Sequence, residues 1–186
     1  ENPSPMFFLQ AGACGALCLL PITLAHLPIV SQIPAKVWLL LVVTGMFQAI
    51  YYCGLAGAYR SGHLSVAYPL ARSAPVILVA VVSVLIGKQK ELTAAAMAGM
   101  ALIAVGSLAL PVGRLSEWKL RDYLHPATLF AMMAAAGTCG YSMVDDQALR
   151  VLRASAGIDA GRVWITLVYA FFETVSSGLW MIVFLL

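Results

Sequence analysis

At residues 64–87 the chain reads LSVAYPLARSAPVILVAVVSVLIG, an apolar run with one charged residue, Arg72. A helix of about 20 predominantly apolar residues is long enough to cross the hydrocarbon core of a bilayer. A fixed charge between two prolines, Pro69 and Pro75, is hard to explain as packing inside such a helix. Ionisable residues within a membrane are costly and mark solute or ion paths. The run therefore predicts a membrane helix that takes part in transport.

The composition extends this prediction to the whole chain. Of the 186 residues, 62% are hydrophobic and 10% are charged, whereas about 25% of the residues in a soluble domain are charged. We predict an all-α polytopic membrane protein with six transmembrane helices. The expected spans are residues 6–27, 36–59, 64–87, 92–112, 126–149 and 163–186.

The chain ends and the loop charges set further expectations. The chain begins at Glu1 rather than at a methionine and stops at Leu186 inside an apolar run, so we expect a fragment of a longer protein. If residues 28–36 are cytoplasmic, six Lys and Arg side chains lie in loops on that side and four on the other. We therefore interpret the net charge of +3 as arising from charged residues that flank the membrane. No basic stripe resembles a nucleic-acid-binding surface, so we expect a lipid bilayer as partner and no nucleic acid.

The second span carries polar aromatic residues at helical spacing. Gln48, Tyr51 and Tyr52 lie on overlapping faces, because residues three and four apart are neighbours on a helix. We interpret them as lining a cavity.

In the third span Tyr68 and Arg72 share one face with Pro75. We interpret this face as meeting a wet cavity, because water or protein must satisfy the carbonyls that proline frees. Two alternatives stay open for Arg72, which are snorkelling to the interface and a structural ion pair.

The last two spans carry carboxyl groups. Tyr141 and Asp145 lie four residues apart in the fifth span, and Asp146 and Arg150 follow them. A carboxylate at this end of the span has three possible roles. It faces water, it pairs with Arg150, or it binds a proton or a substrate amine. Glu173 lies about ten residues into the sixth span, in a polar stripe with Thr166, Tyr169 and Ser176. At that depth a glutamate is protonated, paired or facing water. A purely structural contact between helices is the alternative for it.

The sequence carries no motif of an intramembrane enzyme. It contains no HExxH, GxSxG or DDxxD sequence and no nucleotide-binding loop. The four cysteines lie inside the predicted spans without a CxxC spacing, so we interpret them as packing residues. We therefore predict no catalytic residues, no metal and no cofactor.

Small residues mark the fourth span. At three- and four-residue spacing they let a neighbouring helix approach closely. We expect packing within the chain, with a homodimer face as the alternative. These residues are Ala94, Ala95, Ala98, Gly99 and Gly106.

Two motifs resemble the EamA family of the drug/metabolite transporter superfamily. Residues 58–75 read AYRSGHLSVAYPLARSAP, and residues 137–145 read GTCGYSMVD, which is similar to the opening helix of the family's second half. The resemblance implies a ten-helix transporter built from two five-helix repeats of opposite orientation around a central cavity. The family's Gly-Glu-Arg turn after its fourth helix is replaced here by GKQKE at residues 87–91.

On this pattern the chain divides into three parts. Residues 1–112 form a first repeat that lacks its first helix, residues 113–125 connect the repeats, and residues 126–186 form the first two helices of a truncated second repeat. The resemblance places the substrate site on the second, third and fifth spans. The implied substrate-binding residues are Arg72, Tyr68, Gln48, Tyr51, Tyr52, Tyr141 and Asp145.

We hypothesise a secondary transporter of a small organic metabolite in the bacterial inner membrane, working by alternating access. An anionic or zwitterionic substrate is favoured, because the planar fork of Arg72 suits carboxylate and phosphate groups. Asp145 and Glu173 are candidates for proton coupling. The alternatives are a non-transporting membrane scaffold or subunit and, less favoured, an intramembrane enzyme.

Overall fold

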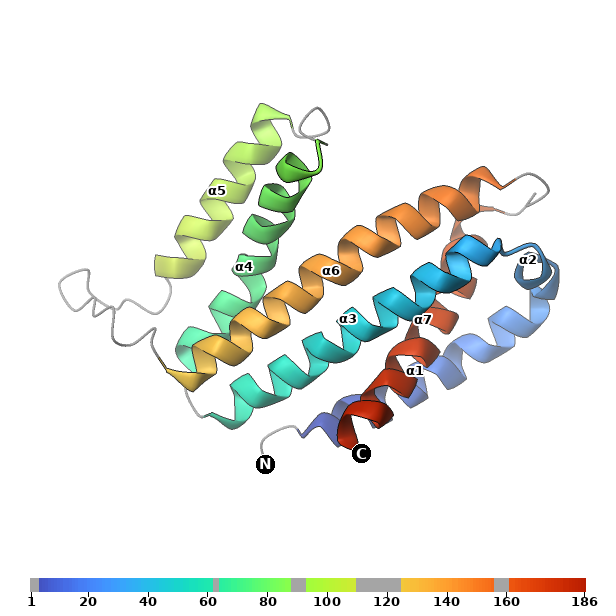
Figure 1. Cartoon of the computed structure of the whole chain (residues 1–186), viewed down its shortest axis with the longest axis horizontal. Coiled ribbons are helices and arrows are strands. Elements are labelled where there is room, and N and C mark those ends of the chain that lie inside the picture. The colour runs from blue at the N-terminus through green and yellow to red at the C-terminus, as the bar shows by residue number, and fades with distance from the viewer. Residues whose placement is uncertain (1–3, 62–63, 88–92, 110–124, 156–160) are drawn as a thin grey trace. The chain divides into compact units, whose positions relative to one another are not determined.

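The structure is a computed structural model that describes residues 4–61, 64–87, 93–109, 125–155 and 161–186, with backbone only at 64–70 and 107–109. The described residues form helices joined by short connections, and none of them lies in a strand. The helices in chain order are α1 (Pro5–Ala25), α2 (Leu27–Ser31), α3 (Ala35–Arg60), α4 (Leu64–Leu85), α5 (Ala94–Ala109), α6 (Pro126–Ala154) and α7 (Arg162–Leu185) (Figure 1).

The six longer helices lie at the six predicted segments, each beginning within two residues of its expected start. That all six of them span a membrane stays a prediction. The largest difference is at the end of α6, which runs to Ala154 instead of residue 149. The added turn carries Arg150 and Arg153, and the ion pair between Asp146 and Arg150 at i and i+4 supports it. A second difference is α2, which follows a break at His26, because Pro28 suits the first turn of a new helix.

Four helices, α1, α3, α6 and α7, are long and apolar enough to cross a membrane. Shorter apolar helical stretches cover residues 71–85 in α4 and 94–106 in α5. Many large apolar side chains are exposed, including Leu17 on α1, Leu102 on α5 and Leu179 on α7. Apolar faces of this extent are compatible with an integral membrane protein, because lipid covers such surfaces.

The chain separates into two compact units, with α3 and α6 each passing from one unit to the other. Among described residues, the first unit is formed by residues 50–139 and the second by residues 4–49 and 140–186. In the second unit α1 packs along α7. Its apolar core joins α2, α3, α6 and α7 through Ile29, Ile33, Val37, Leu41, Ala148, Leu152, Ile165, Val168 and Tyr169.

The first unit holds α4, α5 and the adjoining parts of α3 and α6, with α4 packed against α5. Its buried cluster consists of small side chains, Ala58, Ala71, Ala127 and Ala131. At Gly54 an added Cβ would lie 2.7 Å from the Ala134 nitrogen and 2.9 Å from the Phe130 carbonyl oxygen. The backbones of α3 and α6 therefore approach too closely for any side chain at this position.

The small residues of α5 do not make the close contact expected within the chain. A Cβ at Gly99 or Gly106 would meet nothing within 4 Å, and Ala94, Ala95 and Ala98 are exposed. Small residues at regular spacing permit close packing, but they need a helix on the facing side.

Candidate functional site

Asp145 joins three helices of the second unit. Its Oδ1 accepts a hydrogen bond of 2.5 Å from the Thr44 hydroxyl on α3 and one of 2.7 Å from the Tyr169 hydroxyl on α7. Asp145 itself lies on α6. One carboxyl oxygen thus connects α3, α6 and α7, all of which are long and apolar enough to span a membrane.

A second contact lies one helical turn further along two of these helices. The Gln48 amide on α3 donates from Nε2 to Oε1 of Glu173 on α7 at 2.8 Å. Gln48 follows Thr44 by four residues, and Glu173 follows Tyr169 by four, so each helix presents both residues on one face. We call Thr44, Gln48, Asp145, Tyr169 and Glu173 the polar network.

Close backbone packing holds α3 and α7 together beside the polar network. The Ser176 hydroxyl donates to the Leu41 carbonyl at 2.8 Å, and the Trp180 indole donates to the Val42 carbonyl at 3.0 Å. A Cβ at Gly45 would lie 2.7 Å from the Ser176 Cβ. Glycine is therefore required there, because carbon atoms in contact prefer about 3.5–4.0 Å.

The polar network contains two carboxyl groups and no basic side chain. Among the described residues, these carboxyl groups accept hydrogen bonds from hydroxyl and amide donors only. The adjacent Asp146 points elsewhere and pairs with Arg150 at 3.0 Å, both side chains being largely exposed. The sequence left open whether a carboxylate at the end of α6 pairs with Arg150. Asp146 forms this ion pair, whereas Asp145 faces α3 and α7.

In the described part of the chain, the polar network has hydrogen-bond acceptors that remain unused. Each carboxyl uses one oxygen in the bonds above, and Oε1 of Gln48 is buried without a hydrogen-bond partner among the described residues. The unused atoms of these three groups are acceptors. Because paired negative charges are costly away from water, the polar network suits a proton or a cationic group.

The remaining residues expected at the site lie outside this polar network. Tyr141 is half-buried on α6 in the second unit. In the first unit the rings of Tyr51 and Tyr52 are adjacent, with centroids 5.1 Å apart, and Arg72 is exposed on α4. Tyr68 belongs to α4, and its side chain lies outside the described residues.

Two members of the polar network were not among the predicted site residues. Thr44 was missed because threonine is common in membrane helices, although its spacing of four from Gln48 is a usable signal. Tyr169 belongs to the polar stripe that contains Glu173, but its bond to Asp145 depends on how α6 and α7 pack.

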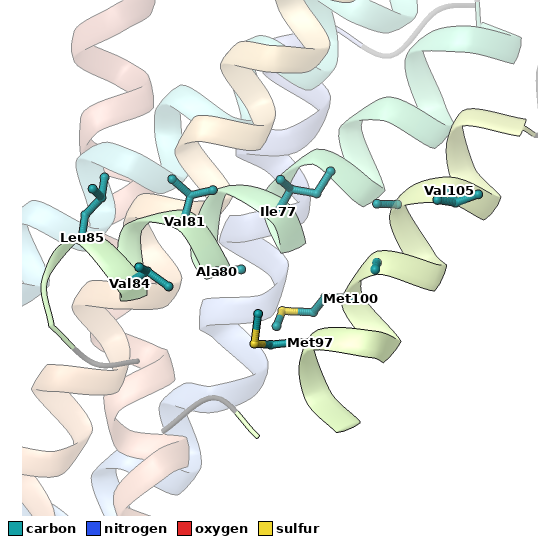
Figure 2. Close-up of a pocket in the computed structure, with 10 residues that line it drawn as sticks. Ile77, Ala80, Val81, Val84, Leu85, Met97, Met100 and Val105 are labelled. Atoms are coloured by element: carbon teal, nitrogen blue, oxygen red, sulfur yellow. The ribbon is translucent and has the colours of Figure 1, made fainter. Parts of the chain in front are cut away.

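A separate pocket of about 560 Å³ lies between α4 and α5. Figure 2 shows that its lining side chains come from these two helices, with Ile77 and Val81 on α4 and Met97 and Met100 on α5. All lining residues are apolar: Ile77, Ala80, Val81, Val84, Leu85, Met97, Met100, Ala101, Ala104 and Val105. None of the described residues that line this pocket has a polar side chain that could recognise a charged solute.

Comparisons of the chain with family models, curated proteins and solved structures gave no match. The resemblance to the EamA family therefore rests on residues 58–75 and 137–145 and stays a prediction.

Proposed function

We propose that this chain belongs to a secondary transporter that moves a small organic metabolite across the bacterial inner membrane by alternating access. The observation that carries the proposal is the polar network on three long apolar helices. In a membrane such groups are rare and characteristic of solute or ion paths. The proposal includes six membrane helices arranged as part of a ten-helix EamA-type inverted repeat.

The charged residues receive separate roles in this proposal. Arg72 binds an anionic group of the substrate, because a guanidinium forms paired hydrogen bonds with carboxylate or phosphate oxygens. Asp145 and Glu173 carry coupling protons, since both are bound by neutral donors and neither contacts a basic side chain in the described part of the chain. The tyrosines at 51, 52, 68 and 141 shape the substrate pocket.

A scaffold or subunit that transports nothing is the alternative. Its support is that the bonds within the polar network also hold α3, α6 and α7 together, as interhelical hydrogen bonds in membranes do. The two functions differ in one consequence. In a scaffold, removing Arg72 changes stability or assembly and there is no flux to lose.

The first experiment reconstitutes the full-length protein in liposomes. Counterflow is measured for a panel of anionic, zwitterionic and cationic metabolites, with wild type, Arg72→Ala and Arg150→Ala. Arg150 is a matched control, because it is exposed and its partner is Asp146. We expect flux selective for anionic or zwitterionic solutes that Arg72→Ala abolishes and Arg150→Ala retains. Unchanged flux in Arg72→Ala would contradict the role of Arg72, and folded protein without any flux would favour the scaffold.

A second experiment tests proton coupling in the same liposomes. Asp145→Asn and Glu173→Gln are compared with Asp146→Asn, which removes the neighbouring exposed carboxylate. We expect the first two variants to lose substrate accumulation driven by a pH gradient while they retain counterflow, and the third to behave as wild type. If all three variants accumulate substrate equally, the polar network has a structural role only.

A further inference from the structure

A small pocket with two cationic side chains lies where α6 ends and α7 begins. Its volume is about 290 Å³, and it is lined by Arg153, Arg162, Val163, Thr166 and Leu167. Arg153 belongs to the last turn of α6, and the other four residues belong to the first turns of α7. The pocket lies entirely within the second unit.

The two arginines of this pocket are placed without a carboxylate partner among the described residues. Arg153 donates from Nη2 to the Thr166 hydroxyl at 3.1 Å, and that hydroxyl donates to the Arg162 carbonyl at 2.8 Å. Asp146 is the nearest acid along α6, and it pairs with Arg150. The first turn of α7 has no acidic residue. Among its described lining residues, the pocket therefore carries two positive charges that an anion can neutralise.

The surroundings of the pocket indicate the level of a membrane surface. Trp164, next to the pocket, stacks on His26 with ring centroids 4.5 Å apart and an interplanar angle of 20°. Tryptophan is enriched where lipid headgroups meet the hydrocarbon core. Val163 is 67% exposed and lines the pocket together with Leu167. Cationic and apolar groups thus share one small pocket at the end of two candidate membrane helices.

We propose that this pocket binds the phosphate headgroup of an anionic phospholipid, with Arg153 and Arg162 contacting the phosphate oxygens. Arginine binds phosphate through paired charge-assisted hydrogen bonds. Basic pockets between membrane helices are known to hold anionic lipid headgroups. The apolar wall formed by Val163 and Leu167 favours a lipid over a free anion, because it covers the first part of an acyl chain. The proposal requires a membrane location and is independent of transport.

The test uses the full-length protein in detergent and native mass spectrometry with added lipid. Phosphatidylglycerol is the anionic probe and phosphatidylcholine the zwitterionic one. The variants are Arg153→Ala, Arg162→Ala and their double mutant. Arg150→Ala is the control, because it removes another exposed arginine that does not line the pocket. Because an arginine near anionic lipid contributes about 1 kcal/mol, each pocket substitution should weaken phosphatidylglycerol binding about fivefold and the double mutant about 25-fold.

The control results decide between the possible explanations. We expect Arg150→Ala to bind phosphatidylglycerol as wild type does, and a double Arg153→Lys and Arg162→Lys variant to bind more strongly than the double alanine variant. Equal loss in Arg150→Ala and in the pocket variants would mean general charge attraction and would overturn the proposal. Inorganic phosphate is the second probe. If it competes at the same concentration as phosphatidylglycerol, the pocket is a free-anion site and the lipid proposal is wrong.

Discussion

Gly45→Ala tests whether the close approach of α3 and α7 holds the polar network in place. The new Cβ would lie 2.7 Å from the Ser176 Cβ and 2.8 Å from the Ser176 carbonyl carbon. Carbon atoms in contact prefer about 3.5–4.0 Å, so each distance is short by roughly 1 Å. Rotating a side chain cannot relieve this overlap, because backbone geometry fixes all three atoms. We therefore expect the two helices to separate locally.

The cost of this separation follows from three contributions. Overpacking costs about 1–3 kcal/mol, and the fixed atoms place Gly45→Ala in the upper part of that range. Weakening the bond from Ser176 to the Leu41 carbonyl, now 2.8 Å, costs about 0.6 kcal/mol for an average interhelical bond in a membrane. Alanine recovers about 1 kcal/mol through its higher helix propensity. The net loss is about 2 kcal/mol, which lowers the thermal midpoint by about 4–8 °C in a chain of this size.

Gly15→Ala is the matched control for this substitution. Gly15 lies on α1 in the same unit, and a Cβ there would meet nothing within 4 Å. Thermal unfolding in detergent, followed by tryptophan fluorescence, compares both variants with wild type. We expect Gly45→Ala to unfold at a clearly lower temperature and Gly15→Ala at an unchanged or slightly higher one. The argument from helix contact is refuted if the two variants unfold at the same temperature.

Two further predictions concern hydrogen bonds and ion pairs. Tyr169→Phe and Thr44→Val each remove a donor to Oδ1 of Asp145, and each should cost about 0.6–1.7 kcal/mol. Because they share an acceptor, a double-mutant cycle should give a coupling of at least about 0.5 kcal/mol, and strict additivity would contradict the shared site. By contrast, Arg150→Ala should change the free energy of unfolding by less than about 0.5 kcal/mol, because its ion pair with Asp146 is exposed. A loss as large as that of Tyr169→Phe would show that this surface pair matters for stability.

The positions of the helices could be predicted because the signal is local. A membrane helix must satisfy its own backbone hydrogen bonds and contain about 20 apolar residues. Both requirements concern consecutive residues, so they can be recognised in the sequence. The same reasoning identified Gln48, Asp145 and Glu173 as unusual, since a polar residue in an apolar run is visible without a structure. It did not identify Thr44, because a hydroxyl in a membrane helix is inexpensive and common.

The sequence by itself determined that the chain is helical, where each long helix begins, and which polar groups lie within apolar segments. Only the tertiary structure decided which of these groups contact one another: Asp145 accepts from Thr44 and Tyr169, while the adjacent Asp146 pairs with Arg150. The physical reason is that adjacent residues on a helix point about 100° apart. Which of two neighbouring carboxylates meets another helix therefore depends on how α6 packs against α3 and α7.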